Sequence, residues 1–112
     1  MRRVVITGLG ALTPVGNDVD TFWKNIQAGV SGAAQITTFD TSKFKTTFAC
    51  SLKDFDAKAH FDVKEIRKYD LFSQYALVSV DQAINDGNID FDTLNRDRIG
   101  VIWGSGNGGI QT

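Results

Sequence analysis

The fold is decided by the stretch at residues 2–17, which reads RRVVITGLGALTPVGN. A short β-branched run at residues 4–7 ends in a glycine turn, followed by a proline and a further glycine. Three consecutive large apolar residues leave no polar face for solvent, so we predict a buried strand over residues 4–7. After this strand, Gly8 and Gly10 are expected to permit a turn and tight packing.

The composition is that of a soluble globular chain. Its 112 residues are 42% hydrophobic, with 13 acidic side chains against 12 basic ones. This balance gives no reason to expect nucleic acid or an anionic membrane as a partner. The start lacks the apolar core of a signal peptide, and no apolar run approaches the ~20 residues that span a bilayer. A single cysteine, Cys50, cannot form an intrachain disulfide, so we expect a reducing, cytoplasmic setting.

Helical periodicity first appears at residues 18–28. The apolar residues of this segment recur at i, i+3, i+4 and i+7, and Asn17 or Asp18 can cap its start, with Gly29 placed to end it. Residues 31–45 have no clear period and predict a long surface excursion. From Phe48 onward, alternating apolar residues predict a strand with one buried face.

The next helix start is strongly signalled. Asp62 is a candidate N-cap with Glu65 as its partner in a capping box, flanked by the pair Phe61 and Ile66 of a hydrophobic staple. A second helix is predicted over residues 70–86, with Gly87 as its stop. Apolar residues cover most of its circumference, which is typical of a helix buried on nearly all sides.

Residues 99–103 form a second apolar run, predicted to be a buried strand, and lead into the glycine-rich segment 104–109. Strand, helix, short strand, helix pair and strand together indicate an α/β sheet layered with helices. These strands are too few to cover so apolar a helix. We therefore expect the missing partners to come from further sequence or from another subunit.

The Gly-x-Gly after the first strand raises the alternative of a small nucleotide-binding α/β domain. In that fingerprint the third glycine would fall at position 13, which is Thr13, followed by Pro14. The predicted helix also begins several residues after the glycine turn. We therefore favour a packing role for Gly8 and Gly10.

Two motifs stand near the start of the chain, Thr7-Gly8-Leu9-Gly10 and Thr13-Pro14-Val15-Gly16-Asn17. By these motifs, and by others that follow in order over nearly the whole chain, it resembles the elongating β-ketoacyl-[acyl-carrier-protein] synthases, the condensing enzymes of fatty acid synthesis, which have the thiolase fold. The further matching segments are Phe22-Trp23-Lys24, Gly29-Val30-Ser31-Gly32, Phe39-Asp40-Thr41-Ser42, Phe48-Ala49, Lys53-Asp54-Phe55, Arg67-Lys68-Tyr69-Asp70 and residues 98–109.

This resemblance implies an α/β fold class. Residues 1–112 would be an incomplete N-terminal part of the first domain of a thiolase-like layered α/β/α/β/α fold. The implied reaction is decarboxylative Claisen condensation of an acyl thioester with malonyl-carrier protein. A cysteine nucleophile and two histidines perform it in the family, and those positions lie beyond residue 112. We expect no catalytic residue in this segment, which would be inactive alone, and a homodimer for the complete enzyme.

Two groups of residues match functional parts of the family. Lys64, Arg67 and Lys68 lie at i, i+3 and i+4 on one helix face, where the family docks its acidic acyl carrier protein. The glycine-rich segment matches the loop beside the acyl pocket and the dimer interface. Its members are Gly104, Ser105, Gly106, Asn107 and Gly108. Asn107 departs from the apolar residue that often gates the pocket of elongating members, whereas a plain turn would equally explain an asparagine between glycines.

The remaining chemistry-bearing side chains do not form a site in the sequence. Cys50 falls in a strand region of the family match, so we expect a small buried hydrophobe rather than the nucleophile. His60 is the only histidine and is expected at the surface. No set of residues has metal-ligand spacing, and we expect neither a metal nor a cofactor.

One alternative of a different class has the same fold. The chain would also fit a non-catalytic partner resembling a chain-length factor, which keeps the fold and the interface but lacks the cysteine. The residue at the family's Thr-Ala-Cys position separates the two interpretations. A free-standing nucleotide-binding domain would instead be stabilised thermally by a nucleotide.

Overall fold

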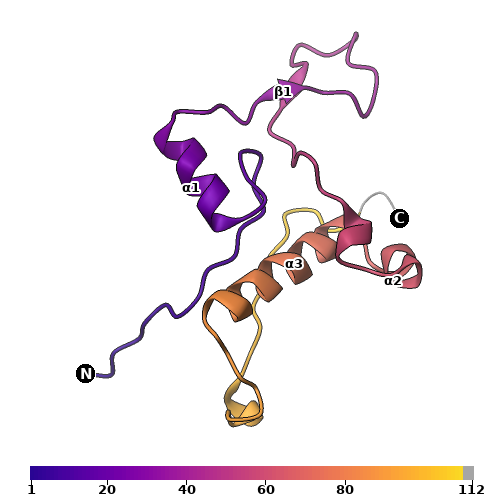
Figure 1. Ribbon diagram of the computed structural model, residues 1–112. Helices are drawn as coiled ribbons and strands as arrows, with labels where there is room; N and C mark the ends of the chain where they lie inside the picture. The colour runs from indigo at the N-terminus through magenta and orange to yellow at the C-terminus, as the bar shows by residue number, and fades with distance from the viewer. Residues whose placement is uncertain (110–112) are drawn as a thin grey trace. The chain divides into compact units, whose positions relative to one another are not determined.

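The computed structural model describes residues 1–109, which divide into two compact units. We call residues 11–55 the turn unit, and residues 1–10 with 56–109 the helical unit. The turn unit contains α1 (Val19–Gln27), β1 (Ala34–Gln35) and β2 (Phe48–Ala49). The helical unit contains η1 (Ala57–Ala59), α2 (Val63–Lys68), α3 (Leu71–Asp86) and η2 (Arg96–Arg98), as Figure 1 shows. No helix within residues 1–109 is long and apolar enough to cross a membrane.

The turn unit begins with a tight turn at residues 13–16. The Thr13 amide donates to the Gly16 carbonyl at 2.8 Å, and the Gly16 amide donates back at 3.2 Å. A β-carbon added to Gly16 would lie 2.8 Å from Phe22 Cα, so this glycine lets the turn contact the first turn of α1. The Asn17 side chain then donates to the Lys53 carbonyl at 2.8 Å and joins the two ends of the unit.

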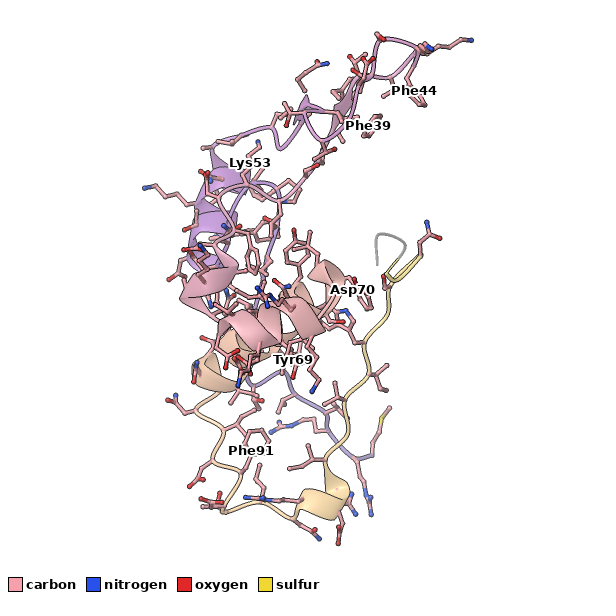
Figure 2. The ribbon with its side chains drawn as sticks, turned by 90° about the vertical axis from the view of Figure 1, so that its right-hand side faces the viewer. Phe39, Phe44, Lys53, Tyr69, Asp70 and Phe91 are labelled. Carbon is pink, nitrogen blue, oxygen red and sulfur yellow. The ribbon has the colours of Figure 1, made fainter. Side chains whose placement is uncertain are left out.

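The predicted helix of this unit is confirmed, with Asp18 as its N-cap. Asp18 accepts hydrogen bonds from the amide and the hydroxyl of Thr21, at 2.7 and 2.8 Å. The predicted strand from Phe48 is confirmed only over β2, which pairs antiparallel with β1 in the register Ala34↔Ala49. β1 interrupts the predicted surface excursion. The long connection between the strands contains an edge-to-face contact of Phe39 and Phe44, with centroids 5.6 Å apart (Figure 2).

Both predicted helices of the helical unit are confirmed. α2 begins with the predicted capping box, in which Asp62 accepts from the amides of Lys64 and Glu65 while the Glu65 carboxylate accepts from the Asp62 amide. α3 ends at Gly87, whose amide donates to the Ala83 carbonyl. These signals lie within a few residues of one another, which is why the sequence suffices to place them.

Gly8 and Gly10 pack directly against the backbone of α3. A β-carbon at Gly8 would collide with the Ala83 carbonyl oxygen and lie 2.7 Å from the Gly87 amide nitrogen. A β-carbon at Gly10 would collide with the Ser79 carbonyl oxygen and lie 2.9 Å from the Ala83 amide nitrogen. Between the two glycines, the Leu9 amide donates to the Asp86 carboxylate at 2.8 Å. The predicted packing role of the two glycines is therefore confirmed.

Two predicted strands are wrong in this structure. Within residues 1–109, no strand ladder includes residues 4–7 or 99–103. Their side chains are also exposed rather than buried, with Val4 at 93% and Ile102 at 99%. A strand is stabilised by hydrogen bonds to a neighbouring strand, and no other run within the described residues pairs with either segment.

The predicted burial of α3 on nearly all sides is also wrong. Within the described residues its buried side chains are Gln74, Val78 and Ser79, whereas Leu71 and Leu77 are 49% and 42% exposed. On one face of α3, the backbone of Gly8 and Gly10 lies against Ser79 and Ala83, and near its start Gln74 contacts the end of α2. Apolar composition predicts the capacity of a helix to be buried, and the burial itself needs neighbours to cover each face.

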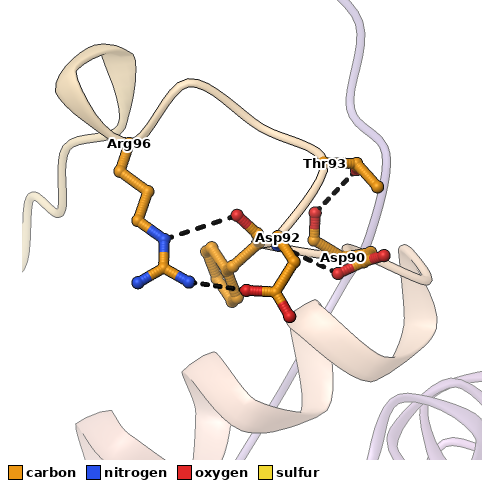
Figure 3. Close-up of polar contacts among 5 residues, drawn as sticks. Asp90, Asp92, Thr93 and Arg96 are labelled. Carbon is orange, nitrogen blue, oxygen red and sulfur yellow. Dashed lines mark hydrogen bonds and ion pairs between the residues drawn. The ribbon is translucent and has the colours of Figure 1, made fainter.

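A short loop with its own polar contacts joins α3 to residues 99–103 (Figure 3). The Thr93 hydroxyl donates to the Asp90 carbonyl at 2.8 Å, and the Asp92 amide donates to the Asp90 carboxylate at 3.0 Å. Arg96 then forms an ion pair with Asp92 at 2.7 Å, with both side chains largely exposed. An exposed pair of this kind contributes about 0.2–1 kcal/mol, so it shapes the loop more than it stabilises the unit.

We predict that Gly10→Ala lowers the free energy of unfolding of the complete protein containing residues 1–112 by about 1–3 kcal/mol. The new methyl group would meet the α3 backbone, which cannot move aside without breaking helical hydrogen bonds. Chemical denaturation measures the change. Gly100→Ala is the matched control, because a β-carbon there would meet nothing within 4 Å. Equal stability of the two variants would contradict this close packing.

A second prediction concerns acid. Hydrogen bonds from the Thr21 amide and hydroxyl hold the pKa of the Asp18 carboxyl below its usual value of 3.8. Its stabilising contribution is therefore present above that value and is lost as pH falls through the lowered pKa. Asparagine caps helices about as well as aspartate, so Asp18→Asn keeps the cap but not the charge. We expect the difference in unfolding free energy between wild type and Asp18→Asn to shrink between about pH 5 and pH 2. A difference that does not depend on pH would refute the prediction, and Asp20→Asn is the control.

Candidate functional site

The predicted cationic residues share one exposed face of α2. Lys64, Arg67 and Lys68 are all exposed, and in the described part of the chain none of them forms an ion pair. The acidic residue of this helix, Glu65, accepts a hydrogen bond from the Asp62 amide within the capping box. Capping thus places one carboxylate at the helix start and leaves the cations available to an anionic partner.

Tyr69, which has no role predicted from the sequence, lies at the C-terminal end of α2 and contacts residues on both sides of it. The Lys68 ammonium lies 5.4 Å from the centroid of the Tyr69 ring, within cation–π range. The same ring meets Phe61 nearly edge-on, with centroids 6.2 Å apart. Tyr69 therefore connects a cation of the exposed face to the aromatic residue that precedes the helix. A tyrosine directly after a basic pair is the signal that would have identified it.

Gln74 was also missed, and it fixes the joint between α2 and α3. Its side-chain amide donates to the Tyr69 carbonyl at 2.8 Å and reaches the Ile66 carbonyl at 3.4 Å. These carbonyls lie at the end of α2, where helices leave acceptors unsatisfied. Gln74 is only 5% exposed, and its Oε1 atom is buried without a hydrogen-bond partner. A polar side chain within an otherwise apolar helix is the sequence signal for such a role.

The glycine-rich segment forms an exposed turn. Gly108 has φ of +59°, and its amide donates to the Ser105 hydroxyl at 3.1 Å. The left-handed residue is therefore Gly108 rather than Asn107, whose side chain is exposed. β-carbons at Gly104, Gly106 and Gly108 would meet nothing within 4 Å. At Gly109, in contrast, a β-carbon would collide with the Asp70 carboxylate.

Cys50 and His60 each lie outside these groups. His60 is exposed as predicted, directly after η1. Cys50 is also exposed, so its predicted burial is wrong. The reason is local, because it follows a two-residue strand whose pairing ends at Ala49. Over residues 1–109, no three His, Cys, Asp or Glu side chains are grouped so that they could hold a metal ion.

The turn unit contains a separate hollow of about 360 Å³ beside the 13–16 turn. Lys53 and Asp54 line one part of it, and the start of α1 lines another. Asp54 has φ of +55°, which is uncommon for a residue other than glycine. None of the predicted site residues lines this hollow.

Comparison with known proteins identifies the family. The model of the β-ketoacyl synthase N-terminal domain matches residues 1–112. The chain belongs to the β-ketoacyl synthase family.

Relatives with the same domain are close in sequence. The 3-oxoacyl-[acyl-carrier-protein] synthase 2 of Staphylococcus aureus strain COL is 48% identical over 99% of this chain. The enzyme of that name from Vibrio cholerae is 46% identical over 98% of it. In both cases the chain spans 27% of the relative's length.

A solved structure supports the predicted fold class. The ishigamide ketosynthase/chain length factor matches with a TM-score of 0.70 and 33% identity, over 83% of this chain and 23% of that chain. The prediction of a thiolase-like ketosynthase fold is confirmed by this match and by the family model. Within residues 1–109, the exposed apolar runs at residues 4–7 and 99–103 belong to no strand ladder.

In this β-ketoacyl synthase chain, we predict that Gln74→Met lowers the free energy of unfolding by about 1–3 kcal/mol. The substitution leaves the carbonyl groups at the end of α2 without their donor at a buried position. Urea denaturation of the complete protein measures the change in the free energy of unfolding. The control is Gln27→Met, at an exposed site in α1. A Gln74→Met protein as stable as this control would show that the joint does not depend on the amide.

Proposed function

We propose that residues 1–112 are the N-terminal part of the first thiolase-like domain of a 3-oxoacyl-[acyl-carrier-protein] synthase. The complete enzyme would elongate fatty acyl chains by decarboxylative condensation of an acyl thioester with malonyl-carrier protein. The observation that carries the proposal is the match of the whole chain to the family, together with the two synthases at 46–48% identity. This segment would be inactive alone, because the family's catalytic cysteine and histidines lie beyond it.

Within that enzyme, the cationic face of α2 would dock the acyl carrier protein. Three cations at positions i, i+3 and i+4 of one helix present a compact positive surface, and acidic partners associate faster with such a surface. The capping box supports this role, because it orders the helix and engages Glu65 away from the cations. The Lys68 ammonium would be held in place by the Tyr69 ring, which lowers the entropic cost of docking.

The test is charge reversal. Lys64→Glu with Arg67→Glu is expected to raise the apparent KM for carrier-protein substrates by roughly tenfold, with kcat nearly unchanged, because rim charges act on encounter. Raising the ionic strength should reduce the difference. The control is Lys43→Glu with Lys45→Glu, two exposed cations in the turn unit. An unchanged KM in the α2 double variant would refute docking on this face.

The glycine-rich loop would form one wall of the acyl pocket, with Asn107 at the gating position. An exposed, polar side chain there would favour a shorter or more polar chain than an apolar gate. Gly108, which is the left-handed residue among residues 104–109, supports the role because it sets the direction of the loop directly after Asn107.

For this loop we expect Asn107→Ile to shift the chain-length preference of the complete enzyme by about threefold or more. One methylene in an apolar pocket changes discrimination by roughly 1–3 kcal/mol. The ratio of kcat/KM for a short and a long acyl donor measures the shift. An unaltered ratio would refute the gating role.

The exposed apolar runs at residues 4–7 and 99–103 would be covered in the complete protein by other segments or by a second subunit. Apolar surface of this extent is unusual on an isolated soluble chain and marks an interface. This agrees with a homodimeric, cytoplasmic enzyme and calls for neither a nucleic acid nor a membrane as partner.

A non-catalytic, chain-length-factor-like partner is the second candidate. The solved neighbour carries both terms in its name, so it does not separate the two. The relatives at 46–48% identity are synthases, which favours the enzyme. Condensing activity of the complete protein alone would decide for the enzyme, and activity only with a second synthase would decide for the partner.

A further inference from the structure

We infer that Asp70 is a positioning residue, which holds the glycine-rich loop to the joint between the docking helix α2 and α3. The inference rests on the proposed function, because it assigns a support to the loop proposed as the wall of the acyl pocket. It starts from the one contact that distinguishes Gly109 from the other glycines of the loop.

Asp70 occupies the N-cap of α3 but does not cap it. Its backbone is extended, with φ of −57° and ψ of 155°, and its side chain makes no capping hydrogen bond to the helix. Aspartate is among the strongest N-cap residues, so a carboxylate turned away from this task indicates another use. The carboxylate instead lies against Gly109, where a β-carbon would collide with it.

Gly109 is a glycine because of this contact. Within residues 104–109, the other glycines have open space around the position of a β-carbon. Among these glycines, only Gly109 lies so close to Asp70 that an added methyl group would displace the Asp70 carboxylate. The loop is thus fixed to the helical unit at its far end, beyond the left-handed residue Gly108.

The joint between α2 and α3, against which the loop lies, is itself held by hydrogen bonds. The Asp70 carbonyl accepts the first hydrogen bond of α3, from the Gln74 amide at 3.0 Å. The Gln74 side chain then holds the Tyr69 carbonyl directly before Asp70. Asp70 therefore lies between the end of α2 and the start of α3, with a hydrogen bond to the Tyr69 carbonyl before it and one to its own carbonyl.

This arrangement connects the two proposed functional parts over a short path. Lys68, on the docking face, is two residues from Asp70, which contacts the end of the loop. Loss of the Asp70 carboxylate should therefore loosen the loop while the docking face, held by the capping box and by Gln74, keeps its shape. The expected signature is a changed chain-length preference at an unchanged KM for carrier protein.

The experiment is a double-mutant cycle in the complete protein, with Asp70→Ala, Gly109→Ala and both together. Gly109→Ala displaces the carboxylate and Asp70→Ala removes it, so both break the same contact and their effects should not add. We expect each single variant to speed hydrogen exchange in residues 104–109 and to change the short-to-long chain ratio of kcat/KM by about threefold or more. The double variant should equal the more affected single variant.

Two controls separate positioning from general destabilisation. Asp81→Ala removes an exposed carboxylate of α3 and should leave both readouts unchanged. Asp70→Asn keeps the shape and one acceptor oxygen, so it should restore most of the wild-type loop protection. If Asp70→Ala does not fold, Gly109→Ala and Asp70→Asn complete the comparison.

The inference is overturned if exchange in the loop is unaffected by Asp70→Ala, or if the effects of the two substitutions multiply. A wild-type protein without condensing activity would refute the proposed function instead. The exchange measurement would still decide whether Asp70 holds the loop.

Discussion

The helical unit depends on the close approach of two backbones. Gly8 and Gly10 lie against the carbonyl groups of α3, at positions where any side chain would collide with the helix. The helix presents its small residues there, because Ser79, Ala83 and Gly87 are spaced four apart and share one face. The hydrogen bond from the Leu9 amide to Asp86 fixes the register of the approach. These contacts hold residues 8–10 against α3.

At the joint between α2 and α3, polar side chains form hydrogen bonds to the backbone at both ends of α2. The capping box orders the start of α2 and uses its acidic side chains, which leaves a face of three cations. Gln74 satisfies the carbonyl groups at the other end, and the Tyr69 ring supports Lys68. The two carboxylates at the start of α2, those of Asp62 and Glu65, both accept hydrogen bonds from backbone amides of the capping box. Hydrogen bonds hold both ends of α2, and a docking surface on a helix held in this way would lose less entropy on binding.

Local signals in the sequence predicted the helices well, because a cap and its partner lie within one turn of each other. Asp62 and Gly87 were placed correctly for this reason, and of the two candidate caps of α1, Asn17 and Asp18, the structure has Asp18. The two buried strands were predicted from apolar runs alone, whereas a strand also needs a neighbour that the sequence pattern does not supply. The prediction that Cys50 is buried was wrong for a similar reason, because a residue type indicates a tendency to be buried and not the presence of residues that cover it.

The candidate site was only partly predictable. The three cations followed from helical spacing and from the family resemblance, which also provided the glycine-rich loop. Tyr69, Gln74 and Asp70 were not assigned roles, because their contacts depend on the geometry of a turn between two helices. We propose that this chain contributes docking and positioning to acyl transfer, and that the nucleophile lies elsewhere in the complete protein.

The most direct test is to map the acyl group. The complete protein would be incubated with an acyl-carrier protein, digested and analysed by mass spectrometry. The account predicts an acyl thioester on a cysteine outside residues 1–112 and an unmodified Cys50. An acyl group on Cys50, or no acyl-enzyme at all, would contradict it.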